Sequence, residues 1–176
     1  MIEKEVSQSY TNHVNYHIFN TEKKELVNKT RASHELYTQD EEVFKVLERG
    51  TEVHSYFELI NFTSDIEPQM EKYQIPVQDK DLLRSFKNQD IFNKPIIKEY
   101  HELPYFTENS KGIIDYIIEY EDSFYIFDFK LKNIDDPLYI TQLKTYKDYL
   151  KTRTNKPIET YLYSIMDREL RKIDTI

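Results

Sequence analysis

The first thirty or so residues are polar and weakly patterned, but from about residue 38 to residue 90 apolar residues recur every three or four positions. This is the period of a helix with one buried side. The capping-box pattern Thr38-Gln39-Asp40-Glu41 predicts a helix start, with Val43, Phe44 and Leu47 as the apolar side of that helix. We expect this first helix to end at Gly50.

Two further helices are expected before the period changes. A second helical segment after Gly50 carries Val53, Phe57 and Ile60 on one side. Residues 81–88 have the pattern of another, shorter helix. Together these segments predict a helical first half of the domain.

Extended segments dominate the second half of the chain. Three strands are predicted over residues 96–105, 112–120 and 123–131, where apolar residues alternate with polar ones or run together. The connection Glu121-Asp122-Ser123 is short, so we expect the last two strands to form a hairpin. The third strand is apolar on both faces, which is typical of a strand in the middle of a covered sheet.

A helix and one more strand complete the pattern. Asp136 followed by Pro137 predicts a helix start, with an acidic N-cap and a proline in the first turn. The apolar stripe of this helix consists of Tyr139, Leu143, Tyr146 and Leu150. A final strand is expected over residues 158–165. Helices, three strands, a helix and a strand predict an α/β fold with a mixed central sheet flanked by helices.

The composition fits one globular domain. The 176 residues can bury a sizeable core, and 39% hydrophobic with 32% charged residues is ordinary. We divide the chain into an N-terminal tail or docking segment, residues 1–30, and a main domain, residues 31–176. The chain has no apolar run that could span a bilayer, and residues 1–5 do not resemble the start of a signal peptide. We therefore expect a cytoplasmic protein without a membrane partner.

Several classes of site are excluded by residue counts. The absence of cysteine excludes zinc fingers and cysteine-ligated iron–sulfur clusters, and two glycines are too few for a nucleotide-binding P-loop. The net charge of −8 argues against a stand-alone DNA clamp. It argues less against a metal-dependent nuclease, whose own site is acidic. Six basic residues cluster after the third strand and could guide a DNA backbone or form a solvated helix face. They are Lys132, Lys144, Lys147, Lys151, Arg153 and Lys156.

Charged residues interrupt the predicted hairpin. Asp128 and Lys130 are two positions apart and share one strand face, and Asp115 lies on the neighbouring strand. A buried carboxylate needs a partner, and two of them offer the hard oxygen ligands that Mg²⁺ binds. Lys130 could position or deprotonate a water, or stabilise negative charge on a phosphate. The alternative is a structural ion pair on the sheet, with Asp115 closing a turn.

The order of these motifs resembles the PD-(D/E)xK nuclease superfamily and, within it, the RecB/AddA-type nuclease domain. The matching segments are Arg49-Gly50-Thr51-Glu52-Val53-His54-Ser55-Tyr56-Phe57-Glu58, Gly112-Ile113-Ile114-Asp115, Asp128-Phe129-Lys130 and Gln142-Leu143-Lys144-Thr145-Tyr146. The resemblance covers about residues 31–165. It implies a restriction-endonuclease-like fold and Mg²⁺-dependent hydrolysis of DNA, with Mn²⁺ able to substitute. It also implies single-stranded or unwound DNA ends as substrates, in recombination and repair.

The same resemblance implies roles for four residues. His54, Asp115 and Asp128 would be metal ligands, and the two aspartates would act with Lys130 as the catalytic residues. Taken without the resemblance, His54 is better read as a helix histidine that packs against the sheet.

Three more residues are candidates for DNA binding or for support of the site. Gln142 and Tyr146 would face the active site and the DNA, although Tyr146 could simply belong to the core. Glu58 could orient the upstream histidine or reach a metal-bound water, or it could be a solvated helix charge. Glu102 could extend the acidic cluster, but we expect Glu99 and Glu102 to decorate a strand edge.

The resemblance leaves the biological setting open. The chain could be the nuclease domain of a helicase, a partner to one, or a small free nuclease, with exonuclease or endonuclease action. Two other functions use the same core. One is a non-catalytic DNA-binding or scaffolding module, and the other is an RNA-directed or defence-type nuclease.

Overall fold

The computed structural model describes residues 41–108 and 110–174, without the side chains of residues 41–46. The expected tail over residues 1–30, the start of the capping box, and the side chains of Val43 and Phe44 lie outside the described part. Within that part, no helix is both long and apolar enough to cross a membrane.

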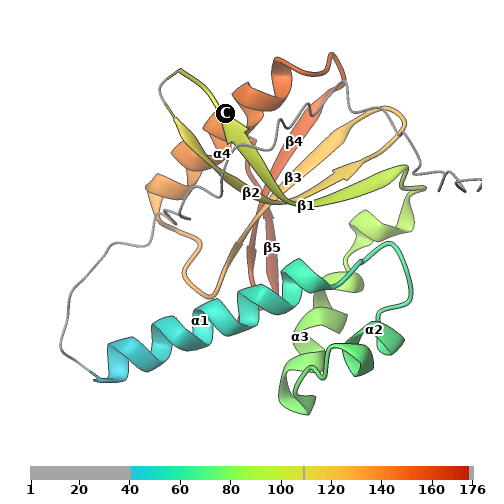
Figure 1. Cartoon of the computed structure of the whole chain (residues 1–176). Coiled ribbons are helices and arrows are strands. Elements are labelled where there is room, and N and C mark those ends of the chain that lie inside the picture. The colour runs from blue at the N-terminus through green and yellow to red at the C-terminus, as the bar shows by residue number, and fades with distance from the viewer. Residues whose placement is uncertain (1–40, 109, 175–176) are drawn as a thin grey trace, which may run out of the picture.

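The described residues form one five-stranded sheet with helices on both faces (Figure 1). The elements are α1 (Glu41–Leu59), α2 (Glu67–Lys72), α3 (Val77–Lys87), the 3-10 turn η1 (Asp90–Asn93), β1 (Lys98–Phe106), β2 (Lys111–Glu119), β3 (Phe124–Lys130), α4 (Pro137–Lys151), β4 (Ile158–Ser164) and β5 (Glu169–Lys172). The strands lie side by side in chain order. Only β3 and β4 are parallel, with α4 as their crossover, and the other neighbours are antiparallel. The predicted α/β fold with a mixed, helix-flanked sheet is confirmed.

β3 is the central strand, as its two apolar faces predicted. Phe127 and Phe129 belong to the core that α1 and α3 form on one face of the sheet. Phe124 and Ile126 belong to the core under α4 on the other face. Phe57 of α1 packs its ring 4.9 Å from that of Phe129, which fixes α1 against β3. This contact also sets the position of the neighbouring turn of α1.

α1 continues through Gly50, so the prediction of two separate helices was wrong. Glycine in a helix costs only about 1 kcal/mol relative to alanine. Burial of Val53, Phe57 and Ile60 offsets this cost. The predicted apolar side of the first helix was also wrong at Leu47, whose side chain is 46% exposed.

Most of the other predicted helix and strand boundaries agree with the structure. The shortest elements were not predicted from the sequence. The four predicted strands begin and end within two residues of β1, β2, β3 and β4. Asp136 caps α4 as predicted, because its side chain accepts a hydrogen bond from Leu138 N at 2.9 Å. The helix predicted over 81–88 begins earlier, at Val77. α2 and β5 were not predicted; they have six and four residues, too few to show a period.

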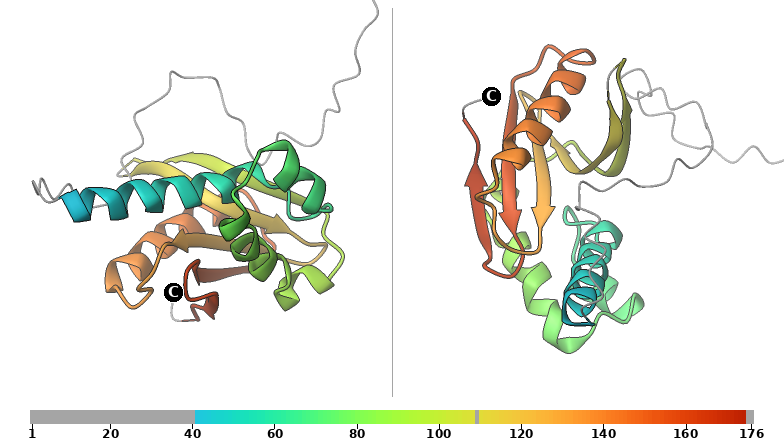
Figure 2. Two further views of the ribbon diagram at one scale, coloured as in Figure 1. Left: turned by 90° about the horizontal axis from the view of Figure 1, so that it is seen from below. Right: turned by 90° about the vertical axis from the view of Figure 1, so that its left-hand side faces the viewer.

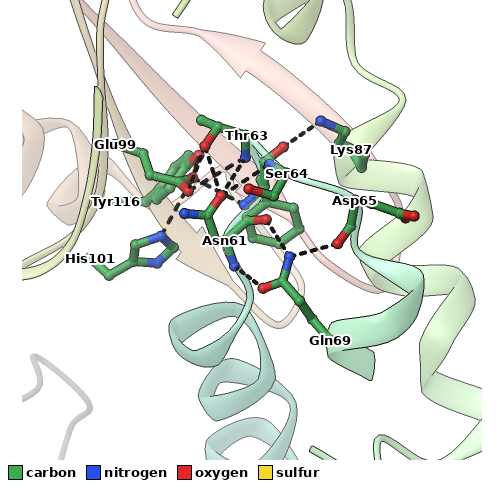
Figure 3. A network of polar contacts seen from close by, with 10 residues as sticks. Asn61, Thr63, Ser64, Asp65, Gln69, Lys87, Glu99, His101 and Tyr116 are labelled. Carbon is green, nitrogen blue, oxygen red and sulfur yellow. Dashed lines mark hydrogen bonds and ion pairs between the residues drawn. The ribbon is translucent and has the colours of Figure 1, made fainter. Parts of the chain in front are cut away.

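Glu99 lies on the edge strand β1, as expected, but its side chain is buried and ties the loop after α1 to this strand (Figure 3). Its side chain is 5% exposed and accepts hydrogen bonds from Phe62 N at 3.1 Å, Thr63 Oγ1 at 3.1 Å and Tyr116 OH at 2.5 Å. Burial raises the pKa of the Glu99 carboxyl, but the contacts from His101 and Tyr116 outweigh it and hold the pKa below its usual value. The ionised carboxylate therefore anchors the end of α1.

Gly50→Ala should raise the free energy of unfolding by about 0.5–1 kcal/mol, because alanine is the better helix former. Its methyl group would meet only Leu131 Cδ2, at an ordinary 3.5 Å. Gly112→Ala is the control: its added carbon would lie 2.8 Å from Cε1 of Tyr105, so that variant should lose stability. Urea denaturation measures both changes. A loss of stability in Gly50→Ala would contradict a continuous α1.

Glu99→Gln should lower the free energy of unfolding at pH 7 by about 1–3 kcal/mol, because the buried N–H and O–H donors lose a charged acceptor. The folded pKa of Glu99 is depressed, so its contribution is present above the unfolded pKa of about 4.3 and is lost as pH falls through the folded pKa. The difference between wild type and variant should therefore shrink in acid. Glu121→Gln, in the exposed turn after β2, should show no such difference.

Candidate active site

The pairing of β2 with β3 ends beside two aspartates. Tyr116 and Phe127 form the last pair of this ladder, and the next opposed positions are Asp115 and Asp128. At that point the Asp115 side chain replaces the backbone partner: Phe129 N donates a hydrogen bond to Asp115 Oδ2 at 2.9 Å. Beyond it the β1–β2 hairpin bends away from β3 (Figure 2). Both carboxylates therefore lie where the sheet opens.

Glu102 lies on the other side of Asp115, at the one position of β1 that is skipped in its pairing with β2. Its neighbours pair as His101 with Tyr116 and Leu103 with Ile114. Its φ of 48° is in the left-handed region, which a non-glycine residue adopts at a cost. After this kink the hairpin packs on the α4 side of the sheet, where Leu103 is buried. Glu102 thus lies on the edge strand, as expected, and also beside His54 and Glu58.

His54 lies between two carboxylates. Its Nδ1 is 3.0 Å from Glu58 Oε1 on the same helix, and its Nε2 is 3.1 Å from Asp115 Oδ2. A neutral imidazole has one N–H. An imidazole that carries both protons donates to both carboxylates, whereas the neutral ring of a metal-bound histidine would keep its proton on Nδ1 toward Glu58 and offer the Nε2 lone pair to the ion. A potential ligand atom of Glu102 also lies within 4.8 Å of those of His54 and Glu58.

Asp128 is almost completely buried, with 1% exposure. Lys130 Nζ lies 2.8 Å from its Oδ2, but no donor in the described residues directs a well-formed hydrogen bond at either oxygen. Burial raises the pKa of Asp128 to about 7, against the attraction of Lys130 and with added repulsion from Asp115. A buried charge needs hydrogen bonds or an opposite charge to offset its lost hydration, and the Asp128 carboxyl has only the charge of Lys130.

Asp115 is better satisfied than Asp128. Burial raises the pKa of the Asp115 carboxyl, but the hydrogen bond and charge of His54 outweigh it and hold the pKa below its usual value. The pKa of Asp115 is therefore lowered and that of Asp128 raised, so the two carboxyls differ in how strongly they hold a proton. A pair of carboxylates in this condition is short of positive charge, and a divalent cation would supply it.

Lys130 joins β3 to α4. Its Nζ donates a hydrogen bond to Gln142 Oε1 at 3.2 Å, and Gln142 Nε2 donates to the hydroxyl of Tyr146. Burial lowers the pKa of the Lys130 amine, but the charges of Asp128 and Asp115 outweigh it and raise the pKa. The amine therefore remains an ammonium group, suited to stabilising negative charge and unsuited to removing a proton.

Tyr146 belongs to the core, and its hydroxyl also reaches Gln142. Its ring is buried and lies 5.3 Å from that of Tyr105, in the core beneath α4. Its hydroxyl meets Gln142 at the rim of the site. The structure therefore brings together all seven sequence-predicted site residues: His54, Glu58, Asp115, Asp128, Lys130, Gln142 and Tyr146.

The basic group on and after α4 is only partly available to a ligand. Lys156 is paired with Glu119 at 2.9 Å, and Lys151 with Asp148 at 3.4 Å. Arg153 lies over the ring of Tyr149. Of these three residues only Lys151 lies on α4, and each is engaged with another residue of the chain.

Comparison with known proteins adds no assignment. The sequence matches none of the family models against which it was compared, and no curated protein shows significant similarity to it. The geometry of the site is therefore the basis for a functional proposal. His54, Glu58 and Glu102 hold potential ligand atoms within 4.8 Å of one another, Asp115 joins them through His54 Nε2, and the ammonium group of Lys130 lies beside Asp128.

Mg²⁺ binding should release protons near pH 7, because a cation held by Asp128 needs the ionised carboxylate and the pKa of that group is about 7. The affinity should fall as pH drops below 7. Calorimetric titration in two buffers of different ionisation enthalpy measures the proton release.

Asp128→Asn should remove the proton release and weaken binding by at least about tenfold. Asp122→Asn, in the exposed turn before β3, should leave both unchanged. Equal Mg²⁺ affinity in wild type and Asp128→Asn would rule out Asp128 as a ligand.

Proposed function

We propose that this chain is a Mg²⁺-dependent nuclease that hydrolyses phosphodiester bonds in DNA, on a restriction-endonuclease-like fold. The observation that carries the proposal is the convergence of His54, Asp115, Asp128 and Lys130 from α1, β2 and β3 at the point where the sheet opens. In line with the motif resemblance, single-stranded or unwound DNA ends are the proposed substrate, with or without a helicase partner.

The donor set fits a divalent cation. Both oxygens of the buried Asp128 lack a well-directed hydrogen-bond donor in the described chain, and Asp115 Oδ2 and His54 Nε2 face each other beside it. These three residues would hold the ion. Carboxylate oxygens suit Mg²⁺, and the imidazole makes Mn²⁺ an equally good occupant. When bound, the ion would polarise the scissile phosphate and lower the pKa of a water.

The chain's own residues supply charge and position around that ion. Lys130 presents an ammonium group that stabilises negative charge as it builds up on the phosphate oxygens in the transition state. Gln142 holds this ammonium by its carbonyl oxygen, and its amide N–H₂ is anchored on the Tyr146 hydroxyl. Glu58 keeps His54 turned so that Nε2 faces the aspartates. The roles proposed are thus ion binding, charge stabilisation and positioning.

At saturating Mg²⁺ or Mn²⁺, Lys130→Met should lower kcat for DNA cleavage by about 10²–10³-fold, because it removes the charge that stabilises the transition state. Asp115→Asn should lose cation binding and activity together. Cleavage of a labelled single-stranded oligonucleotide, with EDTA as the blank, measures this. Cutting by Lys130→Met at the wild-type rate would refute the proposed role of the lysine.

The same preparation separates the rival functions. A non-catalytic module would bind the oligonucleotide and leave it intact with either cation, in wild type and variants alike. An RNA-directed nuclease would cut an RNA of the same sequence faster than single-stranded or duplex DNA. Either result would overturn the assignment as a DNA nuclease.

A further inference from the structure

We propose that Tyr139 positions the ammonium group of Lys130 through the face of its ring, a role that rests on the nuclease function proposed above. Lys130 Nζ lies 4.4 Å from the ring centroid of Tyr139. A cation over an aromatic face at this distance is attracted by the ring's electrons. Tyr139 stands outside the motifs that suggested the site.

Within the described part of the chain, three groups contact the Lys130 ammonium. They are Asp128 Oδ2 at 2.8 Å, Gln142 Oε1 at 3.2 Å and the Tyr139 ring. Lysine has a long, flexible stem, so a fixed position for its charge requires restraint from its surroundings. Tyr139 and Gln142 supply that restraint from adjacent turns of α4, and Asp128 supplies it from β3.

The backbone fixes where the Tyr139 ring lies. Asp136 caps α4 through its side chain on Leu138 N, and Asp136 O accepts a hydrogen bond from Tyr139 N at 3.1 Å. The ring then packs, partly buried, against the core beneath α4. Tyr139 is thus held in the first turn of the helix, one turn before Gln142.

A purely space-filling role predicts a different response to substitution. Phenylalanine keeps the aromatic face and leucine fills much of the volume without it. Positioning through the ring face therefore predicts that Tyr139→Phe behaves as wild type and that Tyr139→Leu does not. The contact is with the ring, so Tyr139→Phe is the conservative variant that preserves it.

In kinetic assays, Tyr139→Leu should lower kcat by about three- to thirtyfold and leave KM nearly unchanged, while Tyr139→Phe keeps both. Tyr149→Leu is the matched control, because this buried tyrosine lies on the same helix and core but contacts Tyr105 and Arg153. It should keep kcat even where it lowers the melting temperature. An equal loss of kcat in Tyr149→Leu, or none in Tyr139→Leu, would overturn the proposal.

A spectroscopic readout keeps this inference separable from the nuclease function. The ring should shift the Cε proton resonances of Lys130 upfield in wild type and Tyr139→Phe, and the shift should vanish in Tyr139→Leu. Lysine-selective labelling with Lys130→Arg for assignment measures it. An inactive wild type with shifted resonances would refute the nuclease and retain the contact. An active wild type without the shift would refute the contact and retain the nuclease.

Discussion

Two opposed carboxylates, one of them almost completely buried, are the constraint on which the rest of this structure depends. Asp115 and Asp128 take the position of the next pair in the β2–β3 ladder. Asp115 is compensated by Phe129 N and by His54, whereas Asp128 has only the charge of Lys130. Since a buried charge is costly without partners, each surrounding element contributes a group that reduces this cost.

The stability of a large neighbouring apolar core offsets the cost of burying these carboxylates. Phe57, Phe86 and Phe129 join α1, α3 and β3, with ring centroids 4.9–5.8 Å apart. Aromatic pairs at such distances add to the stability that burial alone provides. The same contacts hold α1 so that His54 meets Asp115. A stable core therefore does two things here: it keeps the fold together, and it holds polar groups where they would not stay by themselves.

The sequence predicted the parts of this molecule that depend on pattern and missed those that depend on tertiary contact. The two apolar faces of β3 and the Asp136 cap of α4 were readable because period and local hydrogen bonding determine them. The proximity of His54 to Asp115 came from motif order, since 61 positions separate the two residues. The directions of the Glu99 and Glu102 side chains could not be predicted, because only the strand register and the left-handed kink at Glu102 show which way they face.

The charge distribution bears on how the proposed nuclease would meet its substrate. Glu58, Glu102, Asp115 and Asp128 surround the site, and other contacts already hold Lys151, Arg153 and Lys156 of the basic group. Without a bound cation this surface repels a phosphate backbone, since like charges at close range oppose association. A divalent ion reverses the local sign. Under the proposed function, cation binding and DNA binding are therefore coupled: each raises the affinity for the other, and the protein engages DNA productively only in its metal-bound form.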